Sequence, residues 1–160
     1  MKTRDIDYLQ RFYVTHRQAL FTYALSQTGQ REAAEDVVQD VFVKLLERPR
    51  PPKNLRPYVF RMVRNRAIDR ARRREARPEA IIDVDLHSED DPDRDLMSWL
   101  QQGLDALDES EREVIVLKTM DDLSFREIAQ VMDKPQGTVA SWHRRGLERL
   151  RHILEKETIS

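Results

Sequence analysis

The sequence predicts an all-α protein of two small helical domains joined by an acidic flexible linker, the second ending in a helix-turn-helix. Three observations predict this fold. Apolar residues recur at helical spacing along most of the 160 residues, which include only four glycines. An acidic segment at 78–95 interrupts that spacing. Residues 123–154 have the cap, the turn and the basic helix of a helix-turn-helix.

Charge is distributed unevenly along the chain. The net charge is −1 overall, but it is +9 over residues 1–78, −13 over 79–133 and +3 over 134–160. Two basic parts separated by an acidic one indicate two separate nucleic-acid surfaces. The predicted organisation is a first helical domain, a linker and a second helical domain, at 1–77, 78–95 and 96–160.

Several function classes leave no trace in the sequence. Cysteine is absent, which removes disulfides and thiolate metal sites and fits a cytoplasmic location. No apolar run approaches the roughly 20 residues that cross a bilayer, and MKTRDIDYLQRF lacks the apolar core of a signal peptide. Phosphate-loop, H-E-x-x-H and G-x-S-x-G motifs are missing, and the histidines lack metal-ligand spacing. We therefore expect no enzyme activity, catalytic residue, metal, cofactor, small-molecule substrate or membrane insertion.

The first two helices are predicted over 5–28, where Gly29 ends the first, and over 31–47. Their inward residues are expected to be Tyr8, Leu9, Phe12, Ala19, Leu20, Tyr23 and Ala24, then Ala34, Val37, Val38, Val41, Phe42 and Leu45. The other side of the second helix carries Asp36, Gln39, Asp40, Val43 and Glu47. That side is either ordinary solvated surface or a docking face, and an apolar Val43 within it slightly favours docking.

Prolines separate the second helix from the third. The segment Arg48-Pro-Arg-Pro-Pro-Lys53 predicts an extended loop whose cations suit an anionic neighbour. A helix is expected over 55–76, with one stripe formed by Tyr58, Arg61, Asn65, Asp69 and Arg72. An aromatic ring, an amide and guanidinium groups on one stripe can together hold single-stranded DNA. Further attraction for phosphate is expected from the arginine run Arg70, Arg72, Arg73, Arg74 and Arg77. Alternatively, Tyr58 belongs to the core and the arginines only confer solubility.

The second half of the chain begins with the linker. Residues 78–95 have no helical period, although Ile81, Ile82, Val84 and Leu86 can bind a groove. A helix is predicted over 96–107, with Leu96, Trp99, Leu100, Leu104 and Leu107 inward. Asp108 and Glu111 form a capping pattern that opens the next helix, which extends to about Met120.

The helix-turn-helix follows. Ser124 and Glu127 form a capping box, and Asp133-Lys134-Pro135 ends the first helix. The inward side of the second helix is expected to hold Val139, Gly146, Leu147, Leu150 and Leu154. Its remaining surface holds Gln136, Thr138, Ser141, Trp142, Arg144 and Arg145. This arrangement lays the second helix in the DNA major groove, and the alternative is an ordinary helical hairpin.

Three blocks carry a family resemblance: AEDVVQDVFVKLLE (34–47), PYVFRMVRNRAIDRARR (57–73) and LDALDESEREVIVLKTMDDLSFREIAQVMDKPQGTVASWHRRGLERL (104–150). In this order they resemble the extracytoplasmic-function (ECF) sigma factors of bacteria, which carry only the second and fourth conserved sigma domains. The resemblance covers nearly the whole chain outside the linker and the first few residues. It implies a promoter-specificity subunit that binds RNA polymerase core, recognises the -10 and -35 promoter elements and initiates transcription without catalysing a reaction.

The resemblance also implies roles for residues. The D-x-x-Q-D-x-F motif at 36–42 resembles the segment that docks on the polymerase clamp helices, with Phe42 assigned to the core and contacts expected from Asp36, Gln39, Asp40, Val43 and Glu47. Contacts to the -10 element are expected from Tyr58, Arg61, Asn65, Asp69, Arg72 and Arg73, beside a pocket for an extruded base near loop 48–54. Contacts to the -35 element are expected from Gln136, Thr138, Ser141, Trp142, Arg144 and Arg145.

The chain departs from the family pattern in its helix-turn-helix. Ala140 and Trp142 stand where cations are frequent, His143 stands where an apolar residue is usual, and Met132-Asp133 replaces Leu-Gly. Trp142 either packs on the preceding helix or contacts DNA.

The implied partners are RNA polymerase core, promoter DNA and an anti-sigma factor. The linker either tethers the two domains or imitates the charge of RNA in the polymerase channels. Two rival functions are a stand-alone helix-turn-helix regulator and a protein that sequesters polymerase or another sigma factor without reading DNA.

Overall fold

The computed structural model describes residues 1–75 and 102–159. These residues form helices and no strand, which confirms the all-α prediction. They belong to two compact units, the first built from α1 (Thr3–Thr28), α2 (Arg31–Leu46) and α3 (Leu55–Glu75). The second contains α5 (Glu109–Asp121), α7 (Gln136–Ile159) and most of α6 (Phe125–Met132). The chain is also helical over 102–105, and the predicted linker lies outside the described residues.

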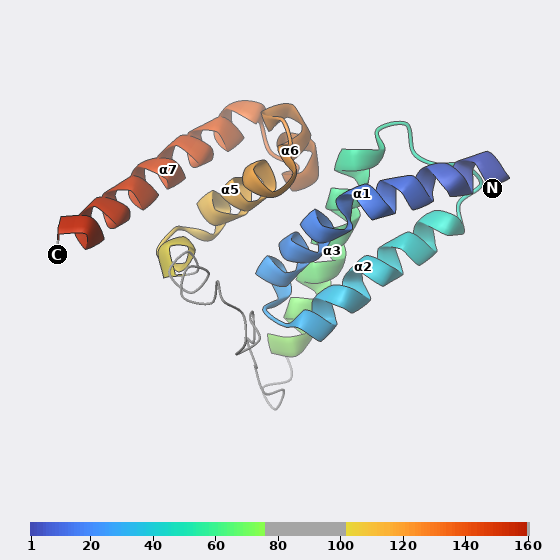
Figure 1. The fold of residues 1–160 in the computed structure, drawn as a ribbon, viewed down its shortest axis with the longest axis horizontal. Coiled ribbons are helices and arrows are strands. Elements are labelled where there is room, and N and C mark those ends of the chain that lie inside the picture. The colour runs from blue at the N-terminus through green and yellow to red at the C-terminus, as the bar shows by residue number, and fades with distance from the viewer. Residues whose placement is uncertain (76–101, 160) are drawn as a thin grey trace. The chain divides into compact units, whose positions relative to one another are not determined.

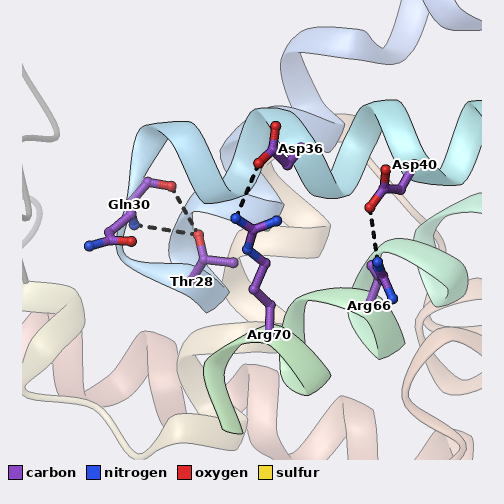
Figure 2. A network of polar contacts seen from close by, with 6 residues as sticks. All are labelled: Thr28, Gln30, Asp36, Asp40, Arg66 and Arg70. Carbon is purple, nitrogen blue, oxygen red and sulfur yellow. Dashed lines mark hydrogen bonds and ion pairs between the residues drawn. The ribbon is translucent and has the colours of Figure 1, made fainter. Parts of the chain in front are cut away.

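In the first unit, α1 packs against both α2 and α3, and α2 packs against α3 (Figure 1). Gly29 ends α1 as predicted, because its φ of 70° lies in the left-handed region that glycine adopts without strain. Gln30 donates its backbone N–H to Thr28 Oγ1 over 3.4 Å and so steadies the turn into α2 (Figure 2).

The core of the first unit consists of one apolar side from each helix. The buried residues are Leu9, Phe12, Ala19, Leu20, Tyr23 and Ala24 of α1, Ala33, Ala34, Val37, Val38, Val41 and Leu45 of α2, and Leu55, Val59, Phe60, Val63 and Ala67 of α3. The expected inward position of Tyr8 is wrong, because this side chain is 45% exposed. Tyr8 is about 100° around the helix from Leu9 and lies at the edge of the apolar side.

Phe42 is half-buried, and its ring meets the ring of Tyr13 edge-on with centroids 4.8 Å apart. The prediction that Phe42 packs inside the unit rather than facing a partner therefore agrees with its contacts. Chain residues 47–54 leave the helical conformation, as the prolines predict, and Pro57 occupies the first turn of α3, where no backbone N–H partner is needed.

In the second unit, α5 packs against α7. The approach is close at Gly146, where an added Cβ would lie 2.6 Å from Ile115 Cδ1. Val139 and Gly146 are buried as predicted, whereas Leu147 is 43% exposed. The inward assignment of Leu147 is wrong for the reason that applies to Tyr8: it lies about 100° around the helix from Gly146. Of the inward residues expected from 96–107, Leu107 is buried and Leu104 half-buried, while Leu96, Trp99 and Leu100 lie outside the described residues.

Candidate nucleic-acid interfaces

The outer side of α2 combines exposed and half-buried residues. Gln39, Val43 and Glu47 are exposed, and the Val43 side chain is 55% exposed. Asp36 and Asp40 are only half-buried because they face α3. The five residues predicted to contact a polymerase therefore divide into three open positions and two that already have partners within the unit.

Those partners are two arginines of α3. Arg70 Nη2 lies 3.1 Å from Asp36 Oδ2, and Arg66 Nη2 lies 3.1 Å from Asp40 Oδ2 (Figure 2). Asp36 pairs with Arg70 and Asp40 pairs with Arg66, so α2 and α3 run antiparallel. Both pairs can form because the two aspartates, like the two arginines, are four residues apart and so lie on the same side of their helix. We call these four residues the paired row. Arg70 was predicted to belong to the arginine run that attracts phosphate, and no role was predicted for Arg66.

The stripe predicted on α3 lies on accessible surface. Arg61, Asn65, Asp69, Arg72 and Arg73 are exposed. Arg74 and Arg77, which the sequence analysis added to this basic run, have no described side chains. The role of the stripe in binding DNA stays a prediction, but Arg61, Asn65, Asp69 and Arg72 are open to a ligand, whereas Tyr58 is half-buried.

Asp40 and Asn65 line one hollow of about 190 Å³ between α2 and α3. Val41 and Met62 supply apolar walls, and charged groups come from Lys44, Arg66 and Asp69. The surface predicted to bind polymerase and the surface predicted to bind the -10 element therefore adjoin each other at this point.

Tyr58 connects the stripe to the proline loop. Arg48 Nη1 donates to the Tyr58 hydroxyl over 2.7 Å, and the guanidinium carbon lies 5.1 Å from the centre of the Tyr58 ring. The buried Arg48 Nε has no hydrogen-bond partner among the described residues. This hydrogen bond and this cation–π contact hold the start of the loop against α3. Tyr58 is half-buried.

The predicted capping box of the helix-turn-helix is present. The Ser124 N–H donates to Glu127 Oε1 and the Glu127 N–H donates to Ser124 Oγ, each over 3.1 Å. Asp133 ends α6 with a φ of 54°, a conformation that aspartate tolerates better than most residues other than glycine. This turn sets the direction in which α7 leaves.

The start of α7 presents the residues predicted to contact the -35 element. Gln136, Arg144 and Arg145 are exposed, while Thr138, Ser141 and Trp142 are half-buried. The half-buried state of Trp142 is compatible with packing and with contact to a ligand, so both predictions remain.

His143 packs between elements of the helix-turn-helix. Its ring meets Phe125 with centroids 5.2 Å apart, and Lys118 Nζ lies 5.3 Å from the centre of the same phenyl ring. Burial, and secondarily the charge of Lys118, lower the pKa of His143 from its usual 6.5. His143 therefore acts as a neutral packing residue within the helix-turn-helix.

Arg149 joins α7 to the start of α5. Its Nη1 lies 3.3 Å from Asp108 Oδ1, and its Nε lies 3.6 Å from Oε2 of Glu111, a side chain only 1% exposed. The predicted capping role of Asp108 is wrong: Asp108 is the N-cap, but its side chain accepts no hydrogen bond from the helix amides. The carboxylate instead forms the ion pair with Arg149.

Among the described residues, no three His, Cys, Asp or Glu side chains gather in a way that could hold a metal ion. Within the same ranges, none of the helices combines the length and the apolar character needed to span a bilayer.

Comparisons with known families match both units. The family model for Sigma-70 region 2 matches residues 12–77, and the model for Sigma-70 region 4 matches residues 97–150. Neither description names a catalytic activity. The first match contains α2 and α3 with the paired row, and the second contains the helix-turn-helix.

Individual relatives agree with these matches. ECF RNA polymerase sigma factor SigE of Mycolicibacterium smegmatis is 31% identical, over 89% of this chain and 60% of SigE, so the chain spans about three fifths of that relative. RNA polymerase sigma factor SigV of Bacillus subtilis is 27% identical, over 91% of this chain and 90% of SigV. The structure of CnrH in complex with the cytosolic domain of CnrY has a TM-score of 0.68 at 25% identity, covering 92% of this chain and 87% of the other.

Proposed function

Since this chain belongs to the sigma-70 family as an ECF sigma factor, we propose that it directs bacterial RNA polymerase core to promoters and initiates transcription. The observation that carries the proposal is the presence of regions 2 and 4 in that order. The chain performs no chemistry itself. It acts in the cytoplasm, where core polymerase and promoter DNA are both present.

The first unit, within residues 1–77, binds core enzyme and the -10 element. Exposed Gln39, Val43 and Glu47, with Asp36 and Asp40 beside them, make the polymerase contact. The -10 contact comes from the stripe on α3, where an exposed amide at Asn65 can hydrogen-bond a base edge and arginines can neutralise phosphates. The hollow beside Asn65 supports this division of labour, because it lies where the two surfaces meet.

The second unit, within residues 96–160, binds the -35 element as duplex DNA. The start of α7 enters the major groove with Gln136, Arg144 and Arg145 exposed to bases and phosphates. Residues 78–95 tether the two units. An anti-sigma factor is expected to hold the protein inactive, as the family resemblance implies. CnrH, which shares this fold, was likewise solved in complex with part of another protein, the cytosolic domain of CnrY.

Reconstitution with purified core polymerase tests the function. The chain is expected to bind core and to give promoter-dependent transcripts from a promoter library. A stand-alone regulator would instead bind duplex DNA without core and add no transcripts. A sequestering protein would bind polymerase but retain its effect after Arg144→Ala and Arg145→Ala, which are expected to abolish promoter-dependent transcription.

Asn65→Ala tests the -10 assignment. Loss of the amide removes base contacts that form only when the strands separate, so promoter opening is expected to fall about tenfold, the value of one good base contact. Core binding is expected to stay unchanged. Permanganate footprinting measures the opening and a pull-down measures core binding. Equal losses in both would contradict the assignment.

A further inference from the structure

The paired row links the two predicted surfaces of the first unit. Asp36 and Asp40 belong to the side of α2 predicted to contact polymerase. Arg66 and Arg70 follow directly after Asn65 and Asp69 on α3, so they lie about 100° around the helix from the predicted -10 stripe. Arginines in that position can reach the phosphates beside a base that is held at Asn65.

The exposure of the paired row makes the pairs exchangeable. The Arg66 and Asp40 side chains are 34% and 43% exposed, and the Arg70 and Asp36 side chains are 41% and 46% exposed. In each pair a guanidinium nitrogen lies 3.1 Å from a carboxylate oxygen, at the surface of the unit. Surface pairs of this kind contribute little to stability, so another charged group can replace either partner at small cost.

The pair in the second unit shows the contrast. Glu111 is 1% exposed and faces Arg149 from inside the unit. Separating that pair would leave a buried charge without compensation, which is costly. The Glu111–Arg149 pair therefore links helices from inside the second unit, whereas both pairs of the paired row lie where solvent and partners can reach them.

We propose that Arg66 and Arg70 are DNA-backbone contacts that become available when polymerase core occupies Asp36 and Asp40. In the free protein the two carboxylates neutralise the two guanidinium groups and weaken their attraction for phosphate. Cationic groups of the docked core take over the carboxylates, and the arginines turn to the single-stranded DNA at the -10 element. This inference rests on the proposed function, because it takes α2 as the polymerase surface.

The coupling acts in both directions. If core binding strengthens DNA binding by a given factor, DNA binding must strengthen core binding by the same factor. The strength of two exposed ion pairs limits that factor to about three- to tenfold. A free sigma factor would thus be kept from DNA by its own acidic face, and assembly with core would remove the restraint.

Neutralising the aspartates tests the restraint in the free protein. The double variant Asp36→Asn and Asp40→Asn is expected to bind a labelled single-stranded DNA of roughly 20 nucleotides about three- to tenfold more tightly than the parent protein. Fluorescence anisotropy at several salt concentrations measures this affinity. The slope of log affinity against log salt is expected to steepen by about 0.7 for each arginine released to a phosphate.

A matched control separates this effect from a simple gain of charge. Glu32 and Glu35 are exposed residues of the same helix, and Glu32→Gln with Glu35→Gln changes the net charge by the same amount. The control variant is expected to gain clearly less affinity than the aspartate variant. Equal gains in the two variants, or no gain in the aspartate variant, would overturn the inference.

Removing the arginines tests the assembled complex. Arg66→Gln with Arg70→Gln is expected to weaken DNA binding by about three- to tenfold in the presence of core and by less than twofold in the free protein. Arg11→Gln with Arg17→Gln, at exposed positions of α1, is the control and is expected to change neither. Equal losses with and without core would contradict release by docking.

The two proposals fail in different ways. If the parent protein gives no promoter-dependent transcripts with core, the proposed function is wrong. If it transcribes normally but the aspartate and control variants bind the single strand alike, only the coupling through the paired row is wrong.

Discussion

Val43 and Val14 are two exposed valines of the first unit, 55% and 60% exposed respectively, and only Val43 lies on the predicted polymerase surface. Their similar exposure makes them a matched pair for testing that surface. An apolar side chain within a polar surface contributes to binding when a partner covers it, and a carboxylate at the same place would be desolvated without compensation.

We predict that Val43→Asp weakens core binding by about tenfold, the value of a moderate interface residue. Val14→Asp introduces the same charge on α1 and is expected to leave core binding unchanged. Titration of labelled protein with core enzyme measures both affinities. Similar losses in the two variants would mean that charge rather than the Val43 surface governs binding.

His143 gives a prediction for pH dependence. Burial and Lys118 lower the pKa of His143 from its usual 6.5 in the folded protein, so the unfolded chain binds a proton more readily. Stability is therefore complete above about pH 6.5 and falls as the pH drops from there towards the lower pKa of the folded state. We predict that His143→Phe reduces the loss of thermal stability between about pH 7 and about pH 5.

Thermal unfolding followed by circular dichroism at each pH measures this effect. Other groups also titrate in this range, so the comparison is between the slopes of the parent protein and the variant. Lys118→Gln removes the secondary cause, and an NMR titration is expected to show the pKa of His143 moving back towards 6.5 while burial still holds it lower. Identical pH slopes in the parent protein and His143→Phe would show that this residue has no such role.

At the scale of an element, α7 contains two glycines with opposite surroundings. An added Cβ at Gly137 would meet no atom within 4 Å, whereas at Gly146 it would lie 2.6 Å from Ile115 Cδ1 and 3.4 Å from Glu111 Cβ. Alanine favours a helix over glycine by about 1 kcal/mol, so only the surroundings distinguish the two positions.

We predict that Gly137→Ala raises the free energy of unfolding by about 0.5–1 kcal/mol. Gly146→Ala is expected to have a lower free energy of unfolding than the parent protein. Ile115 must move within a packed contact, and such overpacking costs about 1–3 kcal/mol, more than the gain in helix propensity. Urea titrations of the two variants give the comparison. A Gly146→Ala variant as stable as Gly137→Ala would show that α5 and α7 separate easily at this point.

The helices themselves could be predicted from local sequence, because caps, breakers and apolar spacing are local properties. Gly29, the Ser124 capping box and the prolines of 48–54 set boundaries that the structure confirms. The side chains at the edges of apolar sides, Tyr8 and Leu147, could not be placed, since their exposure depends on how far the neighbouring helix extends over them.

Contacts between helices were also beyond local sequence. Asp36 and Arg70 are 34 residues apart in the chain and meet only because α2 and α3 pack antiparallel. Asp108 has the position of a cap, but Arg149, in a helix that begins 28 residues later, competes for its carboxylate. The spacing of four residues shared by the aspartates and the arginines was visible in the sequence and could have suggested the paired row.

At the scale of the whole molecule, the division into two units leads to a prediction about fragments. Residues 1–77 and 96–160 are each expected to fold when produced separately, because each contains its own set of packed helices. The first fragment is expected to bind core and the second to bind duplex DNA weakly.

A mixture of the two fragments should select promoters far less well than the intact chain. Tethering raises the effective concentration of the second binding event and can increase overall affinity by about 10²–10⁴. Circular dichroism checks that each fragment is folded, and transcription at matched concentrations measures promoter selection. A mixture as active as the intact chain would show that the connection between the units contributes nothing.

The unbroken course of α3 fixes a length. From Tyr58 to Arg72 the helix rises by about 21 Å, and if α3 binds the melted strand as proposed, this rise sets the length of strand that it contacts. One extra residue inserted after Arg66 would turn everything beyond it by about 100° and put Asp69 and Arg72 out of phase with Arg61 and Asn65. Seven extra residues would restore the phase to within about 20° but lengthen the stripe by about 10 Å, so a protein with the proposed contacts would then need a longer stretch of nucleotides.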